Sequence, residues 1–250
     1  MSSPIDKTRF DADGFLVVRR FLPADEFEEL KANLDRYIRD VVPGLPDAYA
    51  YYQDRARPES LSQLQKMDVD SYFKTYTSNR HWLDVAEAVL GESAEAQAPE
   101  WFNKPPGTEH ATPPHQDNFY WKFDPPQALS LWLALDDVDE ENGCLRYVRG
   151  SHRVPLRPHG ATSVTGFSLG VSDYGPADEA LEVPIRMAPN DLAIHHGDLI
   201  HRADPNRSPT RNRRAFALVM RGASARVDEA AMAEYMASMR AQQRSQGMKV

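Results

Sequence analysis

The sequence is poor in the features that mark several large classes of protein. Its single cysteine, Cys144, excludes an intrachain disulfide and fits a reducing compartment. No apolar run is long enough to span a bilayer, and the N-terminus lacks the apolar stretch of a signal peptide. The formal net charge is -8 and no basic stripe stands out, which argues against nucleic-acid binding. We therefore expect a cytoplasmic protein without nucleic-acid or membrane partners.

Internal repeats and low-complexity linkers are also missing, which predicts a single domain over residues 1–250. With 41% hydrophobic and 26% charged residues, the composition is that of a globular protein with a real core. The residue pattern changes twice along the chain. It predicts a helical N-terminal part over about 1–95, a β-rich core over about 96–222 and a C-terminal helix over about 228–246.

The N-terminal part contains one strand signal and two helix signals. A short apolar run over 15–18 follows a turn signal and predicts a strand. Apolar residues at three- and four-residue steps predict a helix that begins at Pro23 and stops before Pro43. A second helix is expected between an N-cap at Asn79 and a C-cap at Gly91.

The middle of the chain reads as a series of short strands. Runs rich in β-branched and aromatic residues alternate there with Pro, Gly, Asn and Asp, and the clearest runs are 128–135, 144–148, 192–196 and 215–220. Such alternation predicts an antiparallel sandwich or barrel. The final helix, capped near Asp228, has a Met-rich apolar face that we assign to core or dimer packing. The protein is therefore expected to be a monomer or a homodimer.

The first chemical signal is the pair His115 and Asp117. In a strand, residues two apart point to the same face, so both side chains can converge on one point. A third ligand must come from elsewhere, and His201 lies 84 residues after Asp117. Two histidines and one carboxylate form the facial triad of non-haem iron(II) oxygenases. Such a triad leaves coordination positions open for a chelating cosubstrate and dioxygen.

Further motifs stand in a fixed order around this triad. They are Asn103-Lys104-Pro105-Pro106, Trp132, Asn142-Gly143-Cys144-Leu145, Gly150-Ser151-His152, His196, Asn206 and Arg213-Arg214-Ala215. As an ordered set with the triad, they resemble the phytanoyl-CoA dioxygenase (PhyH) family over roughly residues 10–222. The resemblance implies a mainly β fold, with a double-stranded β-helix (jelly-roll, cupin-like) core and flanking α-helices. It also implies iron(II), 2-oxoglutarate as cosubstrate, and ascorbate as a supporting reductant.

The far carboxylate of 2-oxoglutarate needs a fixed cation, and the planar fork of arginine pairs with a carboxylate through two bonds. The candidates are Arg211, Arg213 and Arg214. Arg213 matches the position of the arginine that the family resemblance implies. Strand alternation supports it, because Arg213, Ala215 and Ala217 would share one face and leave room for a ligand. Arg214 remains the alternative.

Other polar and aromatic residues give weaker signals. Trp132 matches a family tryptophan near the cosubstrate, although a place in the barrel core would explain it nearly as well. Lys66 loosely resembles a lysine that contacts the cosubstrate. His196 is expected to form a hydrogen bond within the core, and His195 carries no distinguishing signal.

The resemblance also bears on the reaction and the substrate. In halogenating relatives a small residue replaces the carboxylate ligand, so the presence of Asp117 favours hydroxylation, with release of succinate and CO2. Aromatic residues in the expected lid segments, 49–52 and 118–121, suggest a small or medium organic substrate that reacts with dioxygen. The Gly- and Ser-rich segment 160–176 is expected to be a flexible loop near the site.

Two other functions compete with this prediction. Gly166-Phe167-Ser168-Leu169-Gly170 matches the nucleophile elbow of serine hydrolases, with Ser168 as nucleophile. That motif requires a sharp strand-to-helix turn, and Gly175-Pro176 follows too soon to continue a helix. A non-catalytic jelly-roll metal-binding module is the second alternative. It would be favoured if a metal ligand or the arginine were missing from the sequence, and neither is.

Overall fold

Two antiparallel sheets form the framework of the chain, which a computed structural model describes over residues 5–164 and 167–245. The larger sheet contains, from one edge to the other, β1 (Phe15–Val18), β13 (Leu192–His196), β8 (Ala128–Ala134), β15 (Arg213–Gly222), β5 (Glu100–Lys104), β3 (Leu61–Leu64) and β2 (Ala50–Tyr52). A further strand, β4 (Ala94–Ala96), pairs with the end of β15. The smaller sheet contains β12 (Glu182–Ile185), β9 (Leu145–Val148), β14 (His201–Ala203) and β6 (Thr112–His115).

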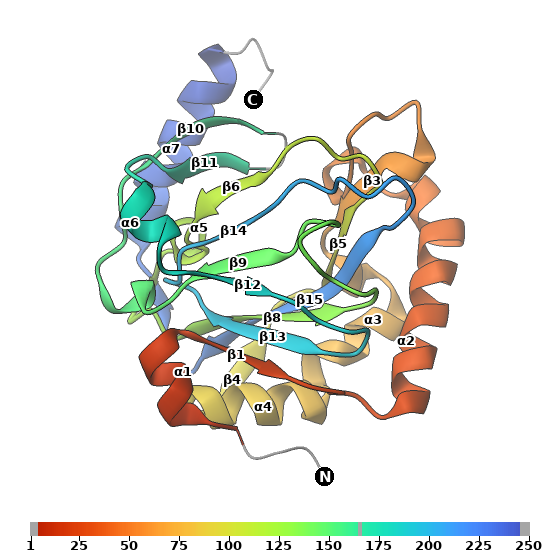
Figure 1. The fold of residues 1–250 in the computed structure, drawn as a ribbon, viewed down its shortest axis with the longest axis horizontal. Helices are drawn as coiled ribbons and strands as arrows, with labels where there is room; N and C mark the ends of the chain where they lie inside the picture. Colours follow the sequence, from red (N-terminus) through yellow and green to blue (C-terminus); the bar gives the residue numbers. More distant parts are fainter. Residues whose placement is uncertain (1–4, 165–166, 246–250) are drawn as a thin grey trace.

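The two sheets face each other across an inner core (Figure 1). Trp132, Ala193 and Ala215 of the larger sheet lie in one buried cluster with Leu145 and Tyr147 of the smaller sheet. This arrangement is the jelly roll, so the predicted fold class is confirmed. Two additional pairs of strands flank it: β10 (His159–Val164) with β11 (Phe167–Val171), and β7 (Phe123–Asp124) with β16 (Arg226–Val227).

Helices cover the outer face of the larger sheet (Figure 1). The α-helices of the described chain are α1 (Lys7–Asp13), α2 (Ala24–Arg36), α3 (Ser71–Lys74), α4 (Arg80–Leu90), α5 (Asn118–Trp121), α6 (Pro176–Glu179) and α7 (Glu229–Ser245). Leu30 of α2, Phe73 of α3 and Trp82 of α4 pack with Phe216 of β15 in a second buried cluster. Within the described residues, none of the helices has both the length and the apolar character that a bilayer span requires.

The expected helix boundaries agree with the structure. The helix that Pro23 introduces runs as α2 to Arg36 and continues as a π-helix to Val41, before Pro43. At the start of α4, the Asn79 side chain accepts a hydrogen bond from the backbone of His81, and at its end Gly91 has a φ of +77°. A positive φ is tolerated by glycine because it has no Cβ.

Two expectations about the segments were wrong in part. The N-terminal part contains more strand than expected: the strand predicted over 15–18 is β1, at one edge of the larger sheet, but the β2–β3 pair at the other edge was not predicted. The segment 160–176 is not a loop, since β10 and β11 form an antiparallel pair within it. Its glycines allow close packing: a Cβ at Gly170 would lie 3.0 Å from the backbone oxygen of Pro114. Glycine density here marks a close approach of two backbones rather than flexibility.

Alternation along β15 determines which side chains reach the interior. Phe216 is fully buried on the outer face, where its ring contacts those of Phe73, Tyr76 and Trp82. The inner face carries Arg213, followed by small residues at 215 and 217 that belong to the inner core. β15 therefore holds the fold together on one face and leaves space on the other, as expected for a strand with a two-residue repeat.

Candidate metal and cosubstrate site

The three predicted metal-ligating side chains converge in the interior of the jelly roll. His115 ends β6 and His201 begins β14, and these two residues are direct cross-strand partners. Their ring centroids are 4.1 Å apart. Oδ1 of Asp117 lies 3.5 Å from Nε2 of His115 and 3.6 Å from Nε2 of His201. One ligand atom from each residue lies within 4.8 Å of the others, so a single cation can contact all three.

The convergence of His115 and Asp117 has a different origin from the one predicted. The strand stops at His115, and Asp117 adopts helical angles, φ -59° and ψ -39°, directly before α5. The two side chains therefore do not share one strand face. A turn at the end of β6 brings the carboxylate back over the histidine. The spacing of His115 and Asp117 therefore predicts the pair, but the extended conformation expected for both residues was wrong.

Both histidine rings are held in an orientation suited to metal binding. Nδ1 of His115 lies 2.8 Å from the carbonyl oxygen of Pro113, and Nδ1 of His201 lies 3.0 Å from that of Leu199. Because a carbonyl only accepts, each Nδ1 carries the hydrogen and each Nε2 presents a lone pair toward Asp117. Burial lowers the pKa of His201 well below its usual range, so its ring is neutral, as a ligand must be.

The Asp117 carboxylate is ionised in spite of its surroundings. Burial alone would raise its pKa, but its interactions with His201, His115 and His195 outweigh this, and the pKa falls well below the usual range. An anionic carboxylate beside neutral imidazoles is a donor set that suits a divalent transition metal such as iron(II). The residues present therefore fit the metal that the sequence implies.

The second oxygen of Asp117 is held by residues that the sequence did not reveal. Ser130 Oγ donates to Oδ2 at 2.6 Å, and His195 Nε2 lies 3.1 Å from the same oxygen. On its other side, Nδ1 of His195 lies 2.9 Å from the hydroxyl of Tyr147, which is fully buried. These contacts orient the carboxylate so that Oδ1 faces the histidines. Outer partners of this kind tune the affinity of a metal site.

Replacing Ser130 with alanine is expected to weaken metal binding by about tenfold to a hundredfold, the usual effect of losing a residue that orients a ligand. The carboxylate would keep its bond to His195 but lose its shortest hydrogen bond. Competition with a coloured chelator measures the affinity for Fe(II). Ser172→Ala is the matched control, because Ser172 is exposed and its hydroxyl donates to the backbone oxygen of Pro158. Unchanged affinity in Ser130→Ala would show that Ser130 does not orient the ligand.

Arg213 is a buried cation on the same inner face. Its residue exposure is 4%, and its guanidinium carbon lies 5.2 Å from the ring centroid of Trp132. Burial lowers its pKa to about 10, so it remains charged at neutral pH. Within the described residues, its Nε has no hydrogen-bond partner and no carboxylate forms an ion pair with it. A buried charge without an anion is costly, which indicates that an anionic ligand completes this site.

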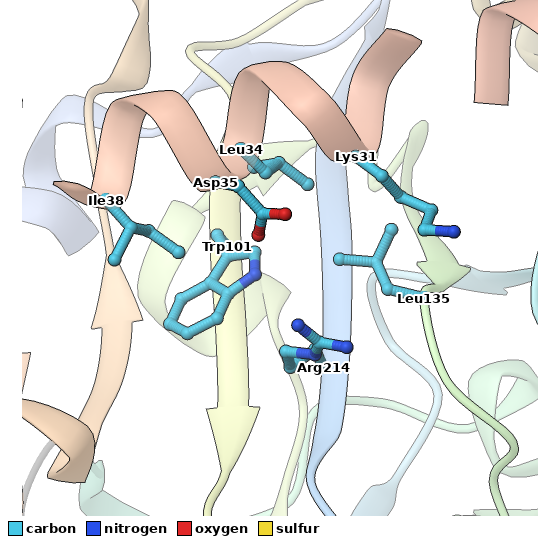
Figure 2. Close-up of a pocket in the computed structure, with 7 residues that line it drawn as sticks. All are labelled: Lys31, Leu34, Asp35, Ile38, Trp101, Leu135 and Arg214. Carbon is cyan, nitrogen blue, oxygen red and sulfur yellow. The ribbon is translucent and has the colours of Figure 1, made fainter. Parts of the chain in front are cut away.

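The two other candidate arginines already have anionic partners. Arg211 pairs with Asp139 and Glu141 at the surface. Arg214 pairs with Asp136, with its Nη2 at 2.7 Å from Oδ1. It lies on the outer face of β15, where Figure 2 shows it in a pocket beneath α2 together with Trp101. Neither guanidinium faces the interior, so Arg213 is favoured over both.

Lys66 and Lys104 differ in burial, since the first is exposed and the second is buried. Lys66 is exposed, and its Nζ lies 5.1 Å from the ring centroid of Tyr49 rather than against the triad or Arg213. Lys104 is buried and is the cross-strand partner of Arg213. Its Nζ donates to the backbone oxygen of Asp204 at 2.6 Å. Burial and the charge of Arg213 lower its pKa to about 6, so Lys104 is neutral near pH 7 and Arg213 carries the local charge.

Aromatic residues form a wall beside the triad. The ring of Phe119 stacks on that of His159 with centroids 3.9 Å apart, and Tyr235 of α7 lies 6.1 Å from both Phe119 and Tyr120. The hydroxyl of Tyr120 donates to the backbone oxygen of Leu169 at 2.6 Å and so attaches α5 to β11. Figure 1 shows α7 beside β10 and β11. His159 of β10 also belongs to this wall.

The serine-hydrolase alternative is not favoured. Ser168 lies within β11, which pairs with β10, and β11 continues to Val171. A nucleophile elbow needs a sharp turn from a strand into a helix at this residue. Gly166 of the motif lies outside the described residues. His196, by contrast, is placed as predicted, because its Nδ1 accepts a hydrogen bond from the backbone of Asp198 at 3.0 Å.

The chain is similar to known proteins over most of its length, and this similarity identifies its family. The model of the family described as "Phytanoyl-CoA dioxygenase (PhyH)" matches residues 10–215. The chain belongs to the phytanoyl-CoA dioxygenase family. The match begins in α1 and ends in β15, so it includes the candidate triad and Arg213.

Curated relatives and solved structures agree with this family. The peroxisomal phytanoyl-CoA dioxygenase of Rattus norvegicus is 27% identical over 213 residues, which are 80% of this chain and 62% of the rat protein. The chain thus spans less than two thirds of that relative. Phytanoyl-CoA dioxygenase 1 of Oryza sativa subsp. japonica is 26% identical, with 84% of this chain and 85% of the rice protein covered. EvdO2 from Micromonospora carbonacea var. aurantiaca, solved with 2-oxoglutarate, is 26% identical with a TM-score of 0.71, covering 91% of this chain and 94% of EvdO2.

Proposed function

We propose that the protein is an iron(II)- and 2-oxoglutarate-dependent dioxygenase that hydroxylates a small or medium organic metabolite and releases succinate and CO2. The observation that carries this proposal is Arg213, a buried cation that pairs with no carboxylate of the described residues, on the inner face of the same barrel that holds His115, Asp117 and His201. A metal triad alone would fit many metalloproteins. The triad together with the Arg213 guanidinium, which can bind a carboxylate, fits a chelating cosubstrate with a second carboxylate.

Each residue has a defined part in this proposal. His115, Asp117 and His201 would hold the iron, which supplies the activation of dioxygen when it is bound. Arg213 would pair with the far carboxylate of 2-oxoglutarate, and the Trp132 ring beside it would exclude water from that pair. Asp117 occupies the position that a small residue takes in halogenating relatives, which favours hydroxylation. We propose no role for Lys66 in cosubstrate binding, because its side chain is exposed.

The relatives support the reaction class and leave the substrate open. EvdO2 binds 2-oxoglutarate in its crystal structure, and the curated relatives from rat and rice are dioxygenases by name. Phytanoyl-CoA itself is not carried over, because one fold serves many substrates. We further propose that residues 1–250 form one oxygenase domain, a monomer or homodimer that acts in the cytoplasm with ascorbate as supporting reductant.

Succinate formation tests the proposal directly. The purified protein is incubated with Fe(II), ascorbate, 2-oxoglutarate and fractions of a metabolite pool, and succinate is quantified. We expect release that requires both iron and 2-oxoglutarate and that rises in the fraction containing the substrate. Tight metal binding without 2-oxoglutarate binding or succinate in any fraction would instead favour the non-catalytic metal-binding module.

A further inference from the structure

Glu100 is an acidic residue on the inner face of the barrel that the proposed chemistry does not use. It begins β5, where it pairs with Ala217 of β15, and Ala217 in turn pairs with Trp132 of β8. Phe102, two residues further along β5, packs against the inner core, whereas Trp101 belongs to the outer core. Alternation therefore directs the Glu100 side chain into the interior.

The register places Glu100 beside the space between the metal triad and Arg213. Ser130, which holds Asp117, pairs with Val219, one inward-facing position beyond Ala217 on β15. Arg213 lies two inward-facing positions from Ala217 in the opposite direction. Since adjacent strands lie about 5 Å apart, Glu100 stands at the side of this space, two strands from Ser130. A substrate that reaches the metal while the cosubstrate occupies Arg213 would pass this carboxyl group.

The charge of Glu100 is not compensated within the described chain. Burial and the nearby charge of Asp117 raise its pKa to about 7, and a hydrogen bond with Gln63 only partly offsets this. No lysine or arginine of the described residues forms an ion pair with it, and the buried side chains of Lys104 and Arg213 belong to positions further along the strands. Its side chain remains partly accessible, so a ligand can reach it. A carboxylate in such a place, without a protein cation beside it, can bind a cationic group of a ligand.

We propose that Glu100 is a substrate-recognition residue, and that the substrate class carries a positively charged amino group that pairs with its carboxylate. This inference rests on the proposed function and names the substrate class of the same site. A cation suits the position better than a neutral group. It would offset the cost of burying the Glu100 carboxylate, whereas a hydroxyl group would leave that charge unbalanced. The neighbouring Trp132 and Phe102 rings would contact the apolar remainder of the substrate.

A pair of matched probes tests the inference. Benzylammonium and benzyl alcohol are titrated calorimetrically, without dioxygen, into protein loaded with Fe(II) and 2-oxoglutarate. The wild-type protein should bind benzylammonium about tenfold to a hundredfold more tightly than the alcohol, as expected for a charge-assisted hydrogen bond. In Glu100→Gln, which keeps the size of the side chain, this preference should disappear while the alcohol binds as before. Glu28→Gln removes the same charge from an exposed side chain of α2 and should keep the preference.

The outcomes separate this inference from the function on which it rests. Equal binding of both probes to the wild type, or a preference that persists in Glu100→Gln, overturns the role of Glu100 while normal 2-oxoglutarate binding leaves the dioxygenase proposal intact. Failure of the wild type to bind 2-oxoglutarate rejects the dioxygenase proposal itself. If Glu100→Gln loses cosubstrate binding through misfolding, Glu100→Asp decides: it retains the charge, so a retained preference supports the role and equal probe binding overturns it.

Discussion

Replacing Arg213 with glutamine is expected to weaken 2-oxoglutarate binding by about thirtyfold to several thousandfold, since truncating one partner of a buried charge pair costs about 2–5 kcal/mol. The guanidinium is buried, remains charged and has no carboxylate partner within the described residues. Glutamine retains a hydrogen-bond donor but neither the charge nor the planar fork. Calorimetric titration of 2-oxoglutarate into the metal-loaded protein measures the loss.

The control for this variant is its neighbour. Arg214→Gln removes the same charge one residue away, but on the outer face, where Asp136 is the partner. Its effect on cosubstrate affinity should stay within about twofold, as for a substitution away from the site. A larger loss in Arg214→Gln than in Arg213→Gln would reverse the assignment and restore the alternative that the sequence left open.

Replacing Asp117 with alanine is expected to lower coupled turnover on the order of a thousandfold or more, because losing the charged member of a buried cation site costs several kcal/mol. Asp117 is the anionic member of the candidate triad, and its Oδ1 faces both histidines. The variant retains two neutral imidazoles, which leave the charge of a divalent cation unbalanced. Metal content after dialysis and succinate formation measure the two effects separately.

The matched control is Asp11→Ala, which removes a carboxylate from an exposed position in α1. It should keep both metal and turnover. Normal succinate production by Asp117→Ala, with normal metal content, would exclude Asp117 as a ligand and with it the proposed triad. Thermal melting of both variants verifies that the fold is intact.

Much of the site was visible in the sequence because a strand has a two-residue repeat. The order Arg213, Ala215, Ala217 placed a cation and two small residues on one face, and the structure puts them on the inner face of β15. The same signal was present in β13, where Ala193 and His195 alternate with Leu192 and Ile194. That signal is ambiguous in the sequence, because His195 and His196 are adjacent and point to opposite faces of the strand.

What the sequence did not reveal depends on contacts between distant segments. Ser130 is one of many serines, and only the pairing of β8 with its neighbours brings it to Asp117. The charge state of Lys104 is set by burial next to Arg213, which no local pattern reports. The strands β10 and β11 carry glycines, which in a sequence are equally typical of a loop. At Gly170, glycine allows the backbone to approach Pro114.

The division of β5 and β15 into two faces has a consequence for how such a protein changes over generations. Inward positions such as 100, 102 and 217 lie on the side of the inner core, whereas Trp101 and Phe216 between them belong to the outer core. A codon change at an inward position can alter the preferred molecule and leave the packing that sustains the fold untouched. Related proteins that descend from one ancestral barrel can therefore come to act on different substrates while they keep the fold. Substrate preference and stability depend on alternate residues of the same strand.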